Sequence, residues 1–329
     1  MKRKLGHSNI EMSAMGMGCW AIGGPFWADE TPLGWGKVDD DESIRAIHTC
    51  LDLGVNLFDT ASVYGAGHSE RVLGKALKGR RDQAIIVTKF GPVFDEESRQ
   101  VTGGDVSPKG IRQSCADSLR RLDTDYIDLF LFHFNDHPVE EAAEVRDTLE
   151  ALVTEGKIRT YGWSTDFADR AEFFAQGPHC SAIEVELNVI DRNPEVTAVC
   201  EQYNLAAINR GPLAMGLLTG KYAPGKKVAS DDVRGKNSPD WMKYFQNGEP
   251  APAWSQKVNA VRDILTSNGR TLAQGALAWL WAHSDKMVPI PGIRTVAQAE
   301  ENCKVMDFGP LKPEQMAEID QILERPLAI

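Results

Sequence analysis

The stretch 55-VNLFDTASVYG-65 decides the fold, together with 84-AIIVTKF-90 and 126-YIDLFLFH-133. Each begins as an apolar run, typical of a strand that is buried on both faces of a parallel sheet, and each ends at polar side chains. If these strands are parallel neighbours in a barrel of strands and helices, their carboxyl ends share one mouth, where such barrels build their sites. The polar residues that we expect to converge there are Asp59, Tyr64, Lys89 and His133.

Strand-like runs alternate with amphipathic helical patterns along the whole chain. The helical segments carry apolar residues at i, i+3, i+4 and i+7, often with Ser, Asp or Pro at the start and Gly at the end. This alternation predicts one (β/α)8 barrel domain over residues 1–329, with an N-terminal hairpin at 3–14 and closing helices at 295–306 and 313–324. The predicted strands are 15–20, 55–60, 84–90, 126–133, 158–164, 182–188, 205–210 and 286–291.

A doubly wound sheet is the main alternative to the barrel. It would normally place a glycine-rich phosphate fingerprint after its first strand. The stretch 16-GMGCWAIGG-24 does not fit G-x-G-x-x-G, and 216-GLLTGKY-222 has too few residues between its first glycine and Gly-Lys for a phosphate-binding loop. The barrel is therefore favoured.

Residues 222–254 interrupt the alternation. The segment is rich in Gly, Pro, Asp, Asn and aromatic residues and has neither a helical nor a strand period. Because it follows the seventh predicted strand, we expect it to lie over the barrel mouth as a lid or a cofactor clamp. A surface loop without ligand contact is the alternative.

The composition excludes several classes of protein. With 42% hydrophobic and 25% charged residues among 329, the chain is typical of a globular protein with a large core. Its net charge of -11 argues against binding to nucleic acid or an anionic membrane, because both are negatively charged. No run approaches the roughly 20 apolar residues of a membrane span, and no apolar stretch follows the basic start. We expect a cytoplasmic protein whose six cysteines are reduced thiols; the sequence does not indicate its oligomeric state.

The four polar residues at the strand ends suit proton donation to a carbonyl oxygen. A lone tyrosine has a pKa of about 10 and is a poor acid at neutral pH. We expect the Lys89 ammonium to lower the pKa of Tyr64, with Asp59 holding the ammonium charged and oriented. His133 would hydrogen-bond the same carbonyl oxygen. Such a donor pairs with hydride delivery to the carbonyl carbon, which no side chain supplies, so a nicotinamide cofactor is implied.

A metal site is the alternative use of the polar residues around His133, since Asp136 and His137 follow it. A barrel metallohydrolase of the common kind would want two histidines at the end of the first strand, and 16-GMGCW-20 has none. We therefore expect no metal.

The chain resembles the aldo-keto reductase superfamily over almost its whole length, most closely the bacterial members. Their pattern FDTAxxYGxGxSExxLGxAL is present as 58-FDTASVYGAGHSERVLGKAL-77. Further motifs follow in the family order: VTKF at 87–90, DYIDLFLFH at 125–133, GKIRTYGWST at 156–165, ELNVIDR at 186–192, GPLAMGLLTGKY at 211–222 and IPGIRTVAQAEEN at 290–302. The resemblance implies the barrel, NADP(H), with NAD(H) possible, no metal, and a small-molecule carbonyl or sugar substrate. It also implies the catalytic tetrad Asp59, Tyr64, Lys89 and His133, with Asp59 also counted at the cofactor.

Carried over to this sequence, the resemblance implies a nicotinamide site with three departures. Ser164 matches the family, but Thr165 stands where Asn is usual. Glu184 replaces a Gln, and Arg210 replaces an aromatic that stacks on the ring in many relatives. A planar guanidinium can also stack on a ring. The residues implied for the pyrophosphate are Gly211, Leu213, Gly216 and Lys221, and those for the adenosine end are Gly292, Arg294, Gln298, Glu301 and Asn302.

The expected function is NADPH-dependent reduction of an aldehyde, ketone or sugar carbonyl, or the reverse oxidation. Arg294 at the start of a helix suits a 2'-phosphate and favours NADP(H) over NAD(H). Two alternatives stay open: an NAD-dependent sugar or polyol dehydrogenase, and a slow-turnover, nucleotide-sensing subunit of a larger assembly. The predicted substrate pocket consists of Trp20, Trp27, Tyr64, Phe90, His133 and Phe134, with Trp20 also beside the cofactor.

Overall fold

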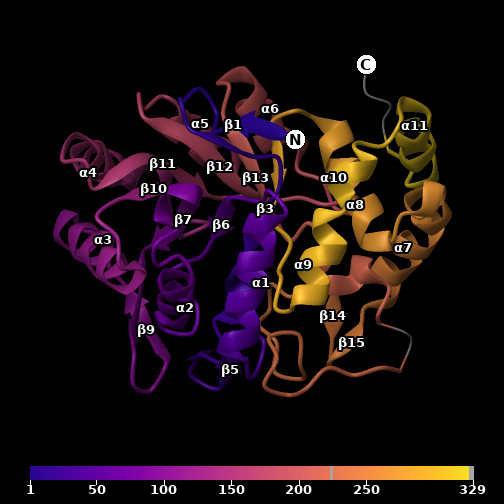
Figure 1. Ribbon diagram of the computed structural model, residues 1–329, viewed down its shortest axis with the longest axis horizontal. Coiled ribbons are helices and arrows are strands. Elements are labelled where there is room, and N and C mark those ends of the chain that lie inside the picture. Colours follow the sequence, from indigo (N-terminus) through magenta and orange to yellow (C-terminus); the bar gives the residue numbers. More distant parts are fainter. Residues whose placement is uncertain (223–224, 326–329) are drawn as a thin grey trace.

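The computed structural model describes residues 1–222 and 225–325 and confirms the barrel. Eight parallel strands follow one another in the order β16-β13-β12-β11-β10-β7-β6-β3. The sheet closes where Gly18 pairs with Gly292, and the Gly18 N–H donates to the Pro291 carbonyl at 2.9 Å. Helices surround the strands on the outside (Figure 1).

All eight predicted strands are present, most of them slightly shorter than predicted. The sixth begins at Cys180 rather than at residue 182. The barrel strands are β3 (Gly16–Gly18), β6 (Leu57–Asp59), β7 (Ile85–Phe90), β10 (Ile127–Phe132), β11 (Ile158–Ser164), β12 (Cys180–Glu186), β13 (Ala206–Arg210) and β16 (Met287–Pro289).

The helices begin where the sequence offers caps. The Ser107 side chain accepts the Gly110 N–H before Pro108, and Thr271 forms a reciprocal capping box with Gln274. The closing helices predicted after the last strand are confirmed. The helices are α1 (Asp40–Asp52), α2 (His68–Ala76), α3 (Pro108–Leu122), α4 (Ala143–Thr154), α5 (Ala168–Ala175), α6 (Pro194–Gln202), α7 (Pro252–Leu265), α8 (Leu272–His283), α9 (Val296–Cys303), α10 (Val305–Phe308) and α11 (Pro313–Ile322).

Short hairpins lie outside the barrel wall. The predicted N-terminal hairpin is formed by β1 (Lys2–Lys4) and β2 (Glu11–Ser13), and its apolar residues share one buried cluster with the barrel interior. The sequence did not predict the side sheet of β5 (Thr31–Pro32), β4 (Trp27–Ala28), β9 (Gln100–Gly104) and β8 (Pro92–Asp95). Nor did it predict the pair β14 (Phe245–Gln246) and β15 (Glu249–Pro250) within 222–254.

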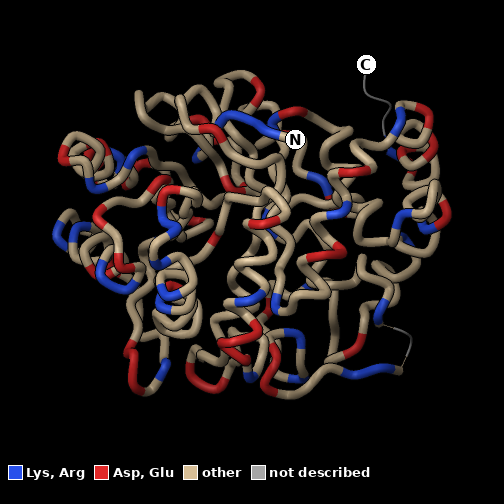
Figure 2. The backbone as a smooth tube through the Cα atoms, viewed as in Figure 1, with Lys and Arg blue, Asp and Glu red and all other residues tan. Residues whose placement is uncertain are grey.

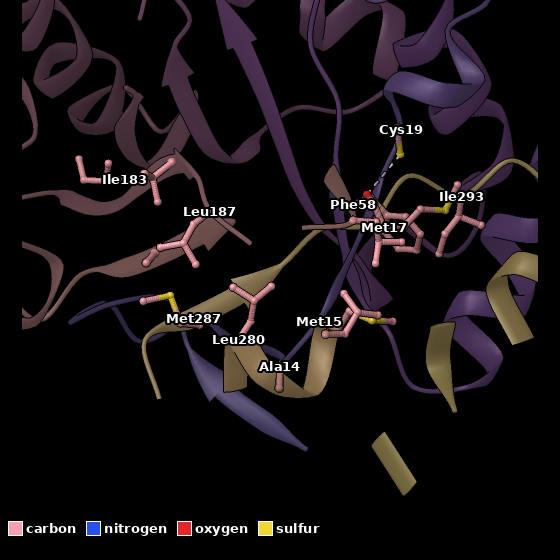
Figure 3. Close-up of a cluster of buried hydrophobic side chains, with 14 of the residues drawn as sticks. Ala14, Met15, Met17, Cys19, Phe58, Ile183, Leu187, Leu280, Met287 and Ile293 are labelled. Carbon is pink, nitrogen blue, oxygen red and sulfur yellow. Dashed lines mark hydrogen bonds between the residues drawn. The ribbon is translucent and has the colours of Figure 1, made fainter. Parts of the chain in front are cut away.

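Side chains alternate between two apolar layers along the barrel strands. Leu57, Val87 and Leu131 belong to the cluster inside the barrel. Phe58 belongs to the larger cluster between strands and helices, part of which Figure 3 shows around Met17. Because the period is two, the residues two positions beyond the interior ones also face inward. The interior rows of β6, β7 and β10 therefore end in Asp59, Lys89 and His133.

The surface, the thiols and the helix lengths add three further facts. Acidic and basic positions are interspersed over the outer helices and loops (Figure 2). All six cysteines are buried and unpaired with one another in disulfides. Within residues 1–222 and 225–325, none of the helices is both long and apolar enough to cross a bilayer.

Candidate active site

Lys89 is the centre of a buried ion pair at the barrel mouth. Its Nζ donates to both carboxylate oxygens of Asp59, at 2.7 Å each, and to the carbonyl oxygen of Thr60 at 2.9 Å. The side chain of Lys89 is fully buried and that of Asp59 is 3% exposed. Burial of an ammonium is costly unless it is paired and hydrogen-bonded, and these contacts meet that condition.

Tyr64 and His133 lie against this ion pair. The Lys89 Nζ is 5.3 Å from the centroid of the Tyr64 ring. The rings of Tyr64 and His133 are 6.0 Å apart and nearly perpendicular, at 81°. Trp20 stacks on Tyr64, with centroids 5.8 Å apart and planes 20° apart. The structure thus brings the four polar residues of three strand ends together.

The loop after β6 fixes the position of Tyr64. Gly65 has a φ of +62°, and a Cβ there would lie 1.8 Å from the carbonyl oxygen of Gly23, so only glycine fits. The Ser69 hydroxyl donates to the carbonyl oxygen of Cys19 at 2.9 Å and ties the loop to the first barrel strand. The Tyr-Gly-x-Gly-x-Ser pattern of the sequence is therefore a packing requirement of the mouth.

The prediction that Lys89 holds the pKa of Tyr64 below its usual value is wrong. Burial raises the pKa of Tyr64 above its usual value, and the nearby carboxylates of Asp59 and Glu184 raise it further. The Lys89 ammonium lowers this pKa, but not enough to offset them. The phenol is therefore protonated at neutral pH and holds a proton that it can donate.

His133 is neutral in this environment. Burial holds the pKa of His133 well below its usual value, and the cations Lys89 and Arg210 lower it further. Within the described residues its Nδ1 is buried and makes no hydrogen bond. A neutral imidazole donates at one nitrogen and accepts at the other, so His133 can hydrogen-bond a substrate oxygen.

Glu184 places a second carboxylate on the same ammonium. Its Oε2 is 3.2 Å from the Lys89 Nζ, and its Oε1 accepts from the Ser164 hydroxyl at 3.2 Å. Burial, and next the charge of Glu184, hold the pKa of Asp59 well above its usual value. The family resemblance implied a contact of Glu184 with the nicotinamide amide; sequence reasoning missed its contact with Lys89, which only strand pairing creates.

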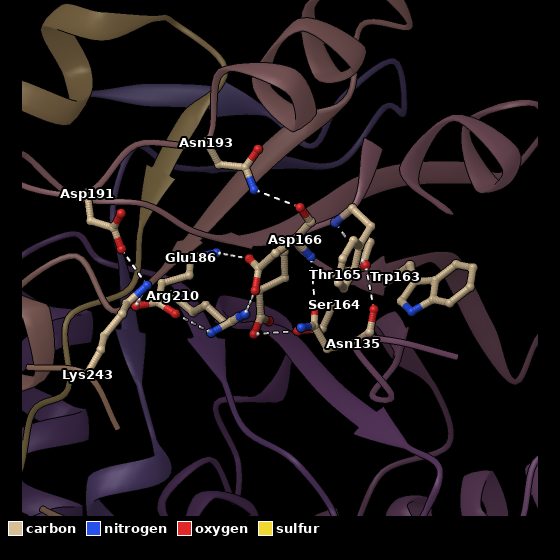
Figure 4. A network of polar contacts seen from close by, with 12 residues as sticks. Asn135, Trp163, Ser164, Thr165, Asp166, Glu186, Asp191, Asn193, Arg210 and Lys243 are labelled. Atoms are coloured by element: carbon tan, nitrogen blue, oxygen red, sulfur yellow. Dashed lines mark hydrogen bonds and ion pairs between the residues drawn. The ribbon is translucent and has the colours of Figure 1, made fainter. Parts of the chain in front are cut away.

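Arg210 is held between two further carboxylates (Figure 4). Its guanidinium pairs with Asp166 and lies 3.3 Å from Glu186, and the Glu186 N–H donates to Asp166 at 2.8 Å. Sequence reasoning missed both acids, although Asp166 stands just after a strand end like the residues it did find. The neighbouring Thr165 donates its hydroxyl to the Asn135 carbonyl at 2.7 Å, so that hydroxyl is already engaged within the protein.

Three cations gather beside the glycine-rich loop after β13. A Cβ on Gly216 would lie 3.3 Å from Arg234 Nη1 and 3.9 Å from Lys221 Cε. Burial, then the charges of Arg234 and Arg294, lower the pKa of Lys221. The Asp232 carboxylate pairs with Arg234 at 2.7 Å. The mutual repulsion of the cations suits a ligand with phosphate charges, so these residues fit the expected pyrophosphate.

Other predicted residues of this region lie on the same loop and the last helix. Gly211 has a φ of +62°, and Leu213 is buried next to Ala214. A Cβ built on Gly292 would meet its nearest neighbour, the Ala21 side chain, at 3.6 Å. Asn302 is buried in α9, and the Glu301 carbonyl accepts from Gln274 at 2.8 Å.

The start of α9 already contains a carboxylate. Glu42 accepts the Val296 N–H at 2.9 Å, at the helix end where a 2'-phosphate was expected. The guanidinium of Arg294 donates to the carbonyl oxygens of Trp35 and Lys37 at 3.0 and 2.6 Å, and Gln298 accepts the Arg294 N–H at 2.8 Å. Arg294 therefore links this helix to the loop that carries Trp35.

Tryptophans line the mouth above Tyr64. Trp20 meets Trp35 edge to face at 5.1 Å and Trp241 at 6.2 Å. Trp241 belongs to 222–254 and is 52% exposed. These three rings therefore form one aromatic group beside Tyr64.

The other predicted pocket aromatics come from three different parts of the fold. Phe90 is a correction: it is fully buried in the layer between strands and helices, with ring centroids 4.7 Å from Phe130 and 5.4 Å from Phe132, because it faces opposite to Lys89. Trp27 lies in β4 of the side sheet. The Phe134 ring packs over the backbone of Gly91, where a Cβ would meet it at 3.1 Å.

The segment 222–254 is anchored by polar contacts to Glu186 and Asp191. The Tyr244 hydroxyl donates to Glu186 at 2.7 Å and to Asp191 at 3.0 Å, and the Lys243 ammonium pairs with both acids. Arg234, also from this segment, stacks over Trp35 at 4.4 Å. The described part of 222–254 thus contributes side chains both to the basic group that is expected to bind phosphates and to the tryptophans near Tyr64.

In the part of the chain that the structure describes, no group of three or more His, Cys, Asp or Glu could hold a metal ion.

Comparisons with known proteins agree with this geometry. Residues 14–324 match the model of the Aldo/keto reductase family. The NADH-specific methylglyoxal reductase of Escherichia coli (strain K12) is 30% identical, over 99% of this chain and 98% of that protein. The glycerol dehydrogenase AKR11B4 from Gluconobacter oxydans is 30% identical, with a TM-score of 0.82 and coverage of 99% and 97%. An aldo/keto reductase from Klebsiella pneumoniae, solved with NADP and acetate, is 25% identical, with a TM-score of 0.68 and coverage of 97% and 94%.

Proposed function

Because the chain belongs to the aldo/keto reductase family, we propose that it reduces the carbonyl group of an aldehyde, ketone or sugar with NADPH, or runs the reverse oxidation. The observation that carries this proposal is the buried Lys89–Asp59 ion pair beneath Tyr64 and beside His133. These groups can bind a carbonyl oxygen and protonate it. When bound, the nicotinamide cofactor supplies the hydride that no side chain can provide.

The residues divide the work at the carbonyl oxygen. Neutral His133 donates a hydrogen bond that orients the carbonyl, and Tyr64 gives its proton to the oxygen as negative charge develops there. The Lys89 ammonium stabilises the phenolate that remains, and Asp59 holds the ammonium in place. In the reverse direction Tyr64 takes the proton back from the hydroxyl of the alcohol.

The cofactor is held, in this proposal, by the loop after β13 and by α9. Lys221, Arg234 and Arg294 form the basic group that fits the phosphates. The proposal of NADP(H) as the cofactor is supported by the Klebsiella relative, whose structure contains NADP. An NAD-dependent polyol dehydrogenase is the second candidate, because the Glu42 carboxylate already occupies the start of α9 and would repel a 2'-phosphate. The other residues that the family resemblance implies at the cofactor, of which Ser164 and Asn302 are examples, are part of the same proposal.

The segment 222–254 acts, in the same proposal, as a clamp on the cofactor within a single barrel domain. Its support is the pair of anchors described above, Arg234 beside Lys221 and Tyr244 on Glu186. We also place the protein in the cytoplasm, a reducing compartment. The support for this is the set of six buried cysteines without a disulfide.

The variant Tyr64→Phe tests the proposed function. It should keep the affinity for the cofactor, because the hydroxyl is the only group removed, and lose about 10²- to 10⁴-fold in kcat/KM. Turnover is followed by the absorbance of the reduced nicotinamide with a panel of carbonyls, and cofactor affinity by calorimetry. Tyr203→Phe is the control, since that exposed hydroxyl contacts Glu172 on the outer helices. Undiminished turnover in Tyr64→Phe would remove the phenol from its role, and a wild type that binds cofactor without turning over any carbonyl would favour the nucleotide-sensing alternative.

A further inference from the structure

We propose that Glu184 places a second carboxylate on the Lys89 ammonium, and that this extra charge makes the site bind the oxidised nicotinamide cofactor in preference to the reduced one. The inference rests on the proposed function and deepens it, because it assigns the favoured direction of the reaction. Glu184 replaces the neutral glutamine that the family resemblance implies at this position. Its contacts in the structure show what the added charge does.

Two buried carboxyl groups meet a single ammonium. Asp59 receives two hydrogen bonds from Lys89 at 2.7 Å, and Glu184 lies 3.2 Å from the same nitrogen. Glu184 is 1% exposed, and its Oε2 makes no hydrogen bond within the described residues. The third hydrogen of Lys89 is used by the Thr60 carbonyl at 2.9 Å. One oxygen of Glu184 is therefore left for a proton or for a cation.

The charges that face this pair do not balance it. Arg210 on β13 is already paired with Asp166 and Glu186, and His133 beyond β10 is neutral. The neighbouring titratable groups without charge are the Tyr64 phenol and the thiol of Cys19, whose pKa is raised by burial. With both carboxyl groups ionised, the cluster would carry one uncompensated negative charge in a buried site, which is costly. Retention of one proton removes that charge, in agreement with the raised pKa of Asp59.

The two redox forms of the cofactor differ by one positive charge on the ring. A bound nicotinamide ring would have to reach the carbonyl carbon whose oxygen contacts Tyr64, so it would lie within short range of the cluster around Lys89. A cationic oxidised ring would compensate the second carboxylate, and the retained proton would be released. The neutral reduced ring leaves the proton in place. The oxidised form therefore gains a Coulombic attraction that the reduced form lacks.

This preference favours reduction of a carbonyl on the protein, because hydride transfer from a reduced cofactor would leave the oxidised form, which the site stabilises. The hydride that a reduced cofactor would supply goes with its two electrons to the carbonyl carbon, and the Tyr64 phenol gives its proton to the carbonyl oxygen. Atoms and charge balance, because the phenol becomes phenolate beside the Lys89 ammonium and the cofactor gains one positive charge. The substrate class that this direction requires is an aldehyde or ketone, including sugars.

The test compares cofactor binding in wild type and Glu184→Gln by isothermal titration calorimetry. Wild type should bind the oxidised form with a lower Kd relative to the reduced form, and the substitution should lower this preference about tenfold. Titration in two buffers of different ionisation enthalpy counts protons. Wild type should release up to about one proton on binding the oxidised form, and the variant should release close to none. A preference changed less than twofold, or equal proton release in both proteins, would overturn the inference.

Two further variants keep the test sharp. Glu184→Asp retains the carboxylate and should preserve proton release, whereas a purely structural role of the glutamate would show equal losses in both substitutions. Glu172→Gln removes the same charge from an exposed position on α5 and should leave the preference unchanged. If wild type binds neither form, the proposed function fails. If it binds both and the preference is insensitive to Glu184, only this inference fails.

Discussion

The substitution Lys89→Met gives the most direct measure of the buried charge cluster. It removes the ammonium that donates to both oxygens of Asp59 and lies 3.2 Å from Glu184, while it keeps most of the side-chain volume. Removal of one partner from a buried ion pair destabilises by about 3–5 kcal/mol, because an uncompensated charge is left behind. We expect a loss of stability in this range near neutral pH, together with loss of turnover.

The loss should depend on pH in a defined direction. In the folded protein the pKa of Asp59 lies well above its usual value, so the folded state binds more protons than the unfolded state. The stability that comes from a raised acid pKa is complete below the unfolded value of about 3.9 and is lost as pH rises toward the folded value. Lys89→Met removes the ammonium that lowers the pKa of Asp59, so this pKa rises further in the folded state. The free energy of unfolding should then fall by up to about 1.4 kcal/mol per pH unit for each additional proton.

Urea denaturation at about pH 5.5 and about pH 7.5 measures this difference. Lys89→Met should be destabilised more at the higher pH, with a steeper pH dependence than wild type. Lys2→Met is the matched control, because Lys2 pairs with Glu11 on an exposed hairpin and should change neither the stability nor its slope appreciably. Equal destabilisation of Lys89→Met at both pH values would refute the argument that the ammonium offsets the charge of the buried acids. A loss of stability no greater than in the control would refute the argument that an uncompensated buried charge is costly.

Three other substitutions separate packing from binding. Phe90→Ala should lower the free energy of unfolding by about 3–5 kcal/mol in urea titrations and leave KM unchanged, since its ring packs outside the barrel; a raised KM with intact stability would return it to the pocket. Arg234→Met should weaken cofactor binding by about tenfold or more in calorimetry, because it removes one of three cations, and unchanged affinity would count against the clamp. Arg294→Ala should weaken both cofactors, since the guanidinium also holds the carbonyls of Trp35 and Lys37; a loss confined to NADP(H) would show that it contacts only the 2'-phosphate.

The sequence by itself determined the barrel and the identity of its polar strand ends. Strands and helices are local features, and their periods, caps and glycines are visible in segments of about ten residues. Asp59, Lys89 and His133 stood out because each ends an apolar run, and the parallel order of the strands brings such ends together. The Tyr64 loop followed from the same stretch, where Gly65 admits no side chain.

Only the tertiary structure decided how these groups balance. Whether Phe90 or Lys89 faces inward depends on the strand register, and a one-residue difference reverses the answer. The pKa of Tyr64 is raised because burial and two carboxylates outweigh one ammonium, and this sum includes Glu184 from a strand far along the chain. Arg234 reaches Lys221 from a segment without any local period. Electrostatic energies add over distance in space, whereas sequence patterns report only neighbours along the chain.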